Sequence, residues 1–168
     1  MSPTKNSVRK DGAVSVSEET LKLASRPGFL IRRLHQIHVA LFLEECAEFD
    51  ITPVQYSLLT ALRSGEMDQK TLAENIGIDH ATTTNVVKRL EVGGWLKRRT
   101  GEKDRRRRLV WLTPAGEVLL DRMHGPAQRA HDRTVSHLKP RDRERFVAYL
   151  TELVEAGNAF GRAPFNIR

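Results

Sequence analysis

Several features that mark whole classes of protein are missing from this chain. Its only cysteine is Cys46, which excludes an internal disulfide framework and any all-cysteine zinc site. Residues 1–20 are polar and lack the apolar run of a signal peptide. No segment approaches the roughly 18 uninterrupted apolar residues of a membrane span. Because 39% of the residues are hydrophobic and can form a core, we expect a soluble globular protein of the cytoplasm, without a membrane partner.

Motifs of the common enzyme classes are also missing. The sequence has no nucleophile elbow, no phosphate-binding glycine loop and no paired metal motif such as H-E-x-x-H. We therefore predict that the chain is not an enzyme and uses no cofactor.

What the chain does have is positive charge in one place. Residues 97–108, KRRTGEKDRRRR, contain eight basic and two acidic side chains, which is +6 of the net +7 of the whole chain. Such a cluster is often only a solvated surface. Four consecutive arginines repel one another unless an anion relieves them, however, and phosphates are the common polyvalent partners. For a soluble chain, this pattern favours nucleic acid over lipid as the source of the phosphates.

Apolar periodicity and capping residues predict a mainly α fold. A long helix is predicted over residues 26–50, and a second over 52–65 with Thr52 as N-cap and Pro53 in the first turn. Two short helices follow, from Asp68 to Gly77 and from Asp79 to Gly93 and Gly94. Their tight connection is typical of a helix-turn-helix.

The helix that begins at Asp79 has one face suited to reading DNA. Thr83, Val86, Val87 and Leu90 form its apolar stripe, and small or hydrogen-bonding residues lie on the other side. Asparagine can pair with adenine, and lysine or arginine with guanine or phosphate. An ordinary amphipathic helix is the alternative, although three consecutive threonines are poor exposed helix formers. The predicted DNA contacts on this helix are Thr82, Thr84, Asn85, Lys88 and Arg89.

A β-hairpin is predicted next, with strands over 95–99 and 108–112 and the arginines near its tip. Directly after a recognition helix, such a hairpin is a wing. An arginine-rich loop suits the narrow minor groove, where negative potential is concentrated. We predict that Arg105, Arg106 and Arg107 contact DNA there.

Together these segments resemble the MarR family, the multiple antibiotic resistance type of winged helix-turn-helix transcription regulator. The resemblance is carried by ITPVQYSLLTAL, by TLAENIGIDHATTTNVVKRLEVGGWLKR and by the wing pattern D-x-R-x5-L-T-x2-G from Asp104 to Gly116. It covers about residues 26–160 and implies that Asp104 braces the wing while Arg106 enters the minor groove. Many relatives have an arginine in place of Asn85, so their base preference does not transfer.

The resemblance also implies a homodimer that binds an inverted-repeat operator on double-stranded DNA. We assign residues 51–113 to DNA binding, 26–50 and 114–162 to helical dimerisation, and 1–25 to a disordered tail. The first helix is apolar around most of its circumference and needs more than one covering surface. The last helix, from Pro140, is predicted to bury Phe146, Leu150, Leu153 and Val154.

Three polar residues, Arg32, His35 and His38, follow one another at a spacing of three within the apolar arc of the first helix. A single histidine there is most often a satisfied core residue. The resemblance implies a small-molecule site partly lined by this helix, and the segment looks most like relatives that control aromatic-acid breakdown. We predict an effector site for a small aromatic carboxylate or phenolic compound, or its coenzyme A thioester, that releases a repressor from DNA.

Three alternatives stay open at this point. Zinc sensing would use His35, His38, Glu45 and His131. Redox sensing would use Cys46, but the two preceding glutamates should raise the pKa of its thiol. A non-specific architectural DNA-binding protein is the third, and would bind random DNA as well as an operator.

Overall fold

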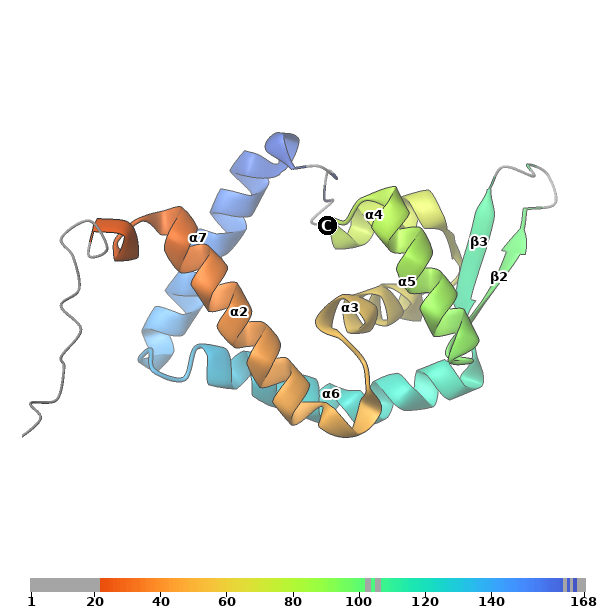
Figure 1. Cartoon of the computed structure of the whole chain (residues 1–168), viewed down its shortest axis with the longest axis horizontal. Helices are drawn as coiled ribbons and strands as arrows, with labels where there is room; N and C mark the ends of the chain where they lie inside the picture. The colour runs from red at the N-terminus through yellow and green to blue at the C-terminus, as the bar shows by residue number, and fades with distance from the viewer. Residues whose placement is uncertain (1–21, 102–103, 105–106, 162, 164, 166–168) are drawn as a thin grey trace, which may run out of the picture. The chain divides into compact units, whose positions relative to one another are not determined.

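The computed structural model describes residues 22–101, 104, 107–161, 163 and 165 (Figure 1). Backbone contacts divide the chain into two units, Met1–His35 and Gln36–Arg168. The elements, in chain order, are α2 (Pro27–Glu45), η1 (Ala47–Phe49), α3 (Pro53–Ala61), η2 (Leu62–Ser64), β1 (Met67–Asp68), α4 (Gln69–Ile76), α5 (His80–Val92), β2 (Leu96–Thr100), β3 (Arg108–Leu112), α6 (Pro114–Thr134), α7 (Pro140–Gly157) and η3 (Asn158–Phe160). The predicted fold class, mainly α with a small β wing, is confirmed.

Helix ends follow the capping residues read from the sequence. Thr52 and Gln55 form a reciprocal capping box at the start of α3, and the Asp68 carboxylate accepts hydrogen bonds from the first backbone N–H groups of α4. Asp79 caps α5 in the same way through Thr82 N, at 2.9 Å. Gly77 ends α4 with a φ of 66°, a left-handed conformation that glycine adopts without strain. The helix-turn-helix is therefore formed by local chemistry.

The first helix is shorter than predicted. The prediction of one helix over 26–50 is wrong at its end, because α2 stops at Glu45 and a 3₁₀ turn, η1, follows. Asp50 then adopts a left-handed conformation, with φ of 50°. This change of direction places Phe49 and Ile51 in the core, and a continued helix would not.

Three antiparallel strands make the sheet, in the order β1-β3-β2. The predicted hairpin is confirmed, with Leu96 opposite Leu112 and Thr100 opposite Arg108. The two-residue strand β1, which the sequence analysis missed, pairs Met67 with Val110 and fixes the hairpin to the start of α4. In Figure 1 the hairpin stands beside α5.

The hydrophobic core of the Gln36–Arg168 unit includes the buried stripe of α5. The predicted stripe of α5 is confirmed, since Thr83, Val87 and Leu90 are buried and Val86 is half-buried. Phe42 is the buried residue of α2 and belongs to this core. The exposed side of α5 is consequently fixed in orientation by packing beneath it.

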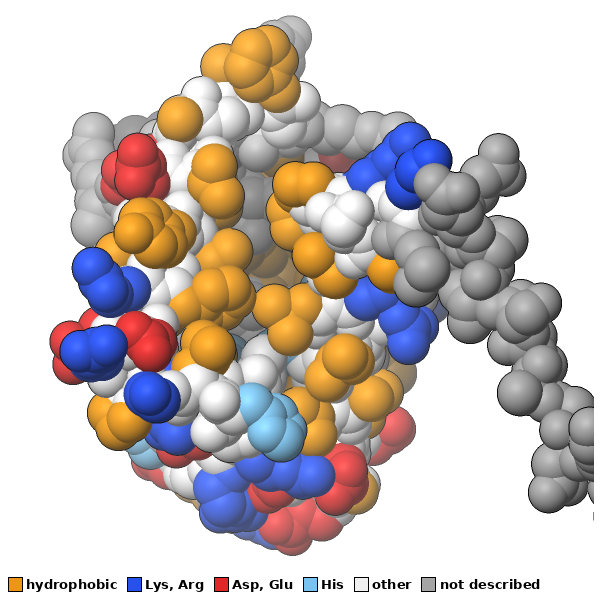
Figure 2. Space-filling model, turned by 90° about the vertical axis from the view of Figure 1, so that its left-hand side faces the viewer, with side chains coloured by type: hydrophobic (Ala, Val, Ile, Leu, Met, Phe, Trp, Pro, Cys, Tyr) orange, Lys and Arg blue, Asp and Glu red, His pale blue; other side chains and the backbone are white. Residues whose placement is uncertain are grey.

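The apolar stripe of α7 is exposed in the single chain. No residue of α7 is buried, so the prediction that Phe146, Leu150, Leu153 and Val154 are buried is wrong for one chain; Phe146 is half-buried and the other three are exposed. Burial needs a second apolar surface, and one chain supplies too little of it against α7. Figure 2 shows hydrophobic side chains gathered on the surface that it views. Among the described residues, no helix combines the length and apolar character needed to cross a membrane.

Within the Met1–His35 unit, the described residues are largely exposed. Of the predicted tail, residues 1–21 lie outside the described residues, and residues 22–24 are helical. Arg32 and His35 are exposed on α2, and the Arg32 guanidinium lies 5.2 Å from the centre of the Phe29 ring.

Candidate nucleic-acid interface and ligand cavity

The exposed face of α5 carries the predicted base-reading residues. Thr82, Asn85, Lys88 and Arg89 are exposed, and Thr84 is half-buried. The hydroxyl of Thr82 donates to Asp79 Oδ2 at 2.7 Å, and that of Thr84 donates to the carbonyl of His80 at 2.9 Å. Because each hydroxyl has one proton, these two side chains can offer only acceptor lone pairs to an approaching base. Donor chemistry on this face would come from the Asn85 amide, Lys88 and Arg89.

Two arginines of strand β2 form ion pairs with acidic residues outside the hairpin. Arg98 pairs with Glu91 at 2.7 Å, and Arg99 contacts Glu66 through two nitrogens at 3.3 and 3.2 Å. These pairs relieve part of the repulsion within the basic cluster. They also fix the hairpin to the helix-turn-helix.

Of the predicted wing contacts, the structure describes Arg107 but not Arg105 or Arg106. Arg107 forms an ion pair with Asp68 at 2.7 Å and still has 58% of its side chain exposed. The pKa of its guanidinium is raised, first by the hydrogen bond to Asp68 and to a smaller degree by the charge of Asp104. Arg105 and Arg106 lie outside the described residues. Their role, the bracing role of Asp104 and the DNA contact of Arg107 stay predictions.

Between α5 and the hairpin lies a polar groove of about 650 Å³. Arg98, Arg99 and Arg108 line it, together with Gln69 and His80. The Gln69 side chain is buried, and its Nε2 has no hydrogen-bond acceptor within the described part of the chain. A groove lined by three arginines suits a phosphate oxygen.

A second cavity, of about 400 Å³, lies beside the helix-turn-helix. Its walls come from α2, α3, the C-terminal end of α4, α6 and the segment after η3. Aromatic and aliphatic side chains make up one part of the lining, which consists of Phe42, Pro53, Tyr56, Ala61, Ile76 and Phe165. The polar part consists of His38, Ser57, Thr60, Asn75 and His131. Of these, only His38 was among the predicted effector residues.

The two histidines of the cavity form a stacked pair. Their ring centres are 5.0 Å apart, with 24° between the planes. His38 Nδ1 lies 2.9 Å from Thr134 Oγ1, and that hydroxyl donates its own proton to the Ala130 carbonyl at 2.8 Å. Thr134 must therefore accept from His38, which places a proton on Nδ1. In a neutral His38 ring, Nε2 is consequently the acceptor nitrogen.

The predicted effector residues are not all in one unit. His38 lies in Gln36–Arg168 and lines the cavity, whereas Arg32 and His35 belong to Met1–His35. Tyr56, Asn75 and Phe165 were missed as lining residues. The sequence carries no local signal for them, because they come together only through packing of separate elements.

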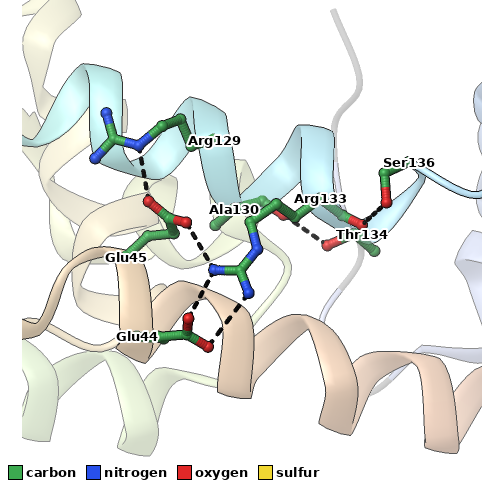
Figure 3. A network of polar contacts seen from close by, with 7 residues as sticks. All are labelled: Glu44, Glu45, Arg129, Ala130, Arg133, Thr134 and Ser136. Carbon is green, nitrogen blue, oxygen red and sulfur yellow. Dashed lines mark hydrogen bonds and ion pairs between the residues drawn. The ribbon is translucent and has the colours of Figure 1, made fainter.

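The carboxylate proposed as a zinc ligand is held by arginines. Glu45 accepts from Arg129 Nε and Arg133 Nη1, both at 2.7 Å, and Glu44 accepts from Arg133 as well (Figure 3). Hydrogen bonds from Arg129 and Arg133 lower the pKa of Glu45. Over the described ranges, no three His, Cys, Asp or Glu side chains come together in a way that could hold a metal ion.

The thiol of Cys46 does not have the environment of a reactive cysteine. Burial raises its pKa, and the charge of Glu45 raises it further, in the direction that the sequence predicted. A buried thiol with a raised pKa has little thiolate at neutral pH. This disfavours the redox-sensing alternative.

Comparison with known proteins identifies transcription regulators. The family model "MarR family" matches residues 51–107. The chain is 28% identical over 135 residues to the HTH-type transcriptional repressor NicR of Pseudomonas putida, covering 80% of this chain and 85% of that protein. Among solved structures it is similar to BpsR of Bordetella bronchiseptica, whose DNA binding is regulated by 6-hydroxynicotinic acid: 32% identity, TM-score 0.73, covering 77% of this chain and 94% of that one. PcaV of Streptomyces coelicolor, in complex with its natural ligand, gives 30% identity, TM-score 0.72 and coverage of 80% and 96%.

Proposed function

This chain belongs to the MarR family of transcription regulators, and we propose that it is a homodimeric repressor released from an inverted-repeat operator by a small aromatic acid or its coenzyme A thioester. The α5 face and the wing bind double-stranded DNA in this proposal. The cavity lined by His38 and His131 binds the effector. Regulation of BpsR by 6-hydroxynicotinic acid and the repressor activity in the name of NicR support the proposal by similarity.

One observation carries the effector part of the proposal. Asn75 and Ile76, at the C-terminal end of α4, form part of the wall of an aromatic cavity that also contains two imidazoles. A planar ring suits the aromatic lining, a hydroxyl group can donate to the acceptor nitrogen of a neutral histidine, and a carboxylate suits a protonated one. Because α4 is the first helix of the helix-turn-helix, an occupant of the cavity touches the DNA-reading motif directly.

Release requires that the effector bind the DNA-free conformation more tightly than the DNA-bound one. The coupling is then reciprocal: operator DNA weakens effector binding by the factor by which effector weakens DNA binding. Calorimetric titration with benzoate, 4-hydroxybenzoate, 6-hydroxynicotinate and benzoyl-coenzyme A, with and without operator duplex, measures one side of this cycle, and titration of operator with and without the bound compound measures the other.

The sharpest residue-level test is His38→Ala. We expect its operator affinity, measured by fluorescence anisotropy, to stay within a few-fold of wild type, while release by the active compound is lost or requires at least tenfold more of it. His124→Ala, an exposed histidine on α6, is the matched control and should respond as wild type does. An unchanged response of His38→Ala would show that this histidine is a packing residue. Equal affinity of the wild type for random DNA would support an architectural protein instead.

A further inference from the structure

The segment after η3 is held in a defined position by one side chain. The Asn158 amide makes two hydrogen bonds to the backbone of Phe165: Oδ1 accepts from Phe165 N at 2.7 Å, and Nδ2 donates to the Phe165 carbonyl at 2.5 Å. A side-chain amide that satisfies both backbone groups of a residue replaces the pairing that a neighbouring strand would give. Phe165 is thereby fixed seven residues beyond Asn158.

Phe165 contacts two functional parts of the molecule at once. Its side chain lines the cavity that contains His38 and His131. The same side chain packs on Gly77, since a Cβ at Gly77 would lie 3.4 Å from Phe165 Cβ and 3.7 Å from Cδ2. Gly77 is the turn residue between α4 and α5. One aromatic side chain therefore joins the cavity to the turn of the helix-turn-helix.

A nearby phenylalanine shows that this placement is specific. Phe160, in η3, is 92% exposed, whereas Phe165 is half-buried. Both belong to the same C-terminal segment, but only Phe165 has its backbone clamped by Asn158. The difference gives a matched pair of residues for experiment.

We propose that Phe165 is an effector-contacting residue, positioned by Asn158, whose ring packs on the aromatic effector and transmits cavity occupancy to the turn at Gly77. The proposal rests on the proposed effector function of the cavity and deepens it. Aromatic rings gain from offset or edge-to-face contact with one another, so the ligand class is a planar aromatic compound. Asn158 acts through Phe165 and is a positioning residue.

The first experiment measures effector and operator binding by Phe165→Ala, Asn158→Ala, the double variant and Phe160→Ala, with the four probe compounds. We expect Phe165→Ala to weaken effector binding by about 2- to 13-fold, the range of one aromatic contact. Operator affinity without effector should stay within about twofold of wild type, and Phe160→Ala should match wild type throughout. Asn158→Ala should weaken effector binding, and the double variant should be no weaker than Phe165→Ala alone, because the clamp acts only through the ring.

The second experiment needs no effector. The amides of Gly77 and Ile78 both donate to the Ala73 carbonyl, so hydrogen exchange at these positions reports on the turn. We expect exchange there to be about fivefold faster in Phe165→Ala and Asn158→Ala than in wild type and Phe160→Ala. Unchanged exchange in Phe165→Ala would overturn the contact with the turn, whatever the cavity binds.

The two failures are distinguishable. If wild type binds none of the four probes, the proposed effector class fails, and the effector role of Phe165 with it. If wild type binds a probe and Phe165→Ala binds it equally well, only the present inference is overturned.

Discussion

The carboxylate of Asp68 serves two elements at once. It caps α4 through the backbone N–H groups of Lys70 and Thr71, and it pairs with Arg107 of the hairpin. Burial alone would raise its pKa, but the hydrogen bonds from Arg107 and Thr71 outweigh burial and lower the pKa from 3.8 to about 2. A lowered pKa means that the charged form stabilises the fold above pH 3.8 and that this contribution is lost as pH falls toward 2.

Asp68→Asn should therefore separate charge from capping, because asparagine is also a good N-cap. The pKa shift corresponds to about 2 kcal/mol at neutral pH, and the solvent exposure of Arg107 reduces this to roughly 1 kcal/mol. We expect the variant to lose about that much free energy of unfolding at pH 7 in urea titrations, and the deficit to shrink as pH falls below 4. Asp121→Asn, which removes an exposed pair with Arg63, is the control and should change stability by less than about 0.5 kcal/mol. A pH-independent deficit in Asp68→Asn would contradict the ionic assignment.

Asn85 and Arg106 are expected to act on DNA in different ways. Asn85→Ala should change the preference among operator variants by roughly 1 to 3 kcal/mol at one base position, because a base-edge hydrogen bond is lost.

Arg106→Ala should weaken binding to all sequences and reduce the dependence of affinity on salt, because fewer counterions are released. Anisotropy titrations at several salt concentrations measure both. Arg141→Ala, which removes an exposed cation at the start of α7, is the charge-matched control; an equal loss in that variant would sink the wing assignment.

At the scale of elements, ion pairs join the end of α2 to α6. Figure 3 shows Glu45 between Arg129 and Arg133, and Arg133 also contacts Glu44. Glu45 has 16% of its side chain exposed, whereas Glu44 has 65% exposed. The shielded carboxylate with two guanidinium partners should matter more than the exposed one with a single partner.

We accordingly expect Glu45→Gln to lower the urea midpoint at pH 7 more than Glu44→Gln does. The pKa of Glu45 is lowered from its ordinary value of 4.5, so its contribution is present above pH 4.5 and is lost as pH falls below that value. The difference between the two variants should disappear in acid. If Glu44→Gln lowers the urea midpoint at pH 7 more than Glu45→Gln does, then Glu44, and not Glu45, makes the stabilising ion pair between α2 and α6.

In the whole molecule, the exposed apolar stripe of α7 is a candidate contact surface for a partner. Tyr149 is 60% and Leu153 is 63% exposed, and contiguous exposed apolar side chains are typical of interaction surfaces. Homodimerisation, as proposed, would bury this stripe against a second copy. The two recognition helices would then read half-sites about 10 base pairs apart, centre to centre.

Leu153→Asp should break the dimer, because burying an unpaired carboxylate in an apolar interface is strongly unfavourable. Light scattering of the wild type should give about twice the mass of one 19.1 kDa chain, and Leu153→Asp should move toward the single-chain mass. Val92→Asp introduces the same charge at an exposed apolar residue of α5, within the region assigned to DNA binding, and should remain dimeric. A folded wild-type monomer at micromolar concentration would contradict the dimer.

Features that depend on neighbours along the chain could be predicted from the sequence. The starts of the helices at Thr52, Asp68 and Asp79, the α5 stripe and the hairpin follow from interactions within a few residues, so their patterns are readable without a fold. The family resemblance rests on the same local segments. Gly116 of the wing pattern has a structural reason as well, since a Cβ there would lie 2.0 Å from the Trp95 carbonyl oxygen.

Which distant residues share a site depends on how separate elements pack together. The effector residues predicted from α2 have helical spacing, but the cavity joins His38 to His131 and to Phe165, which are far away in the sequence. Likewise, the short strand β1 and the pair between Asp68 and Arg107 depend on the hairpin folding back on α4. The spacing of apolar residues shows which side of a helix is apolar, but it does not show which element packs against that side. For the same reason the α7 stripe was readable as apolar, while its exposure in one chain was not.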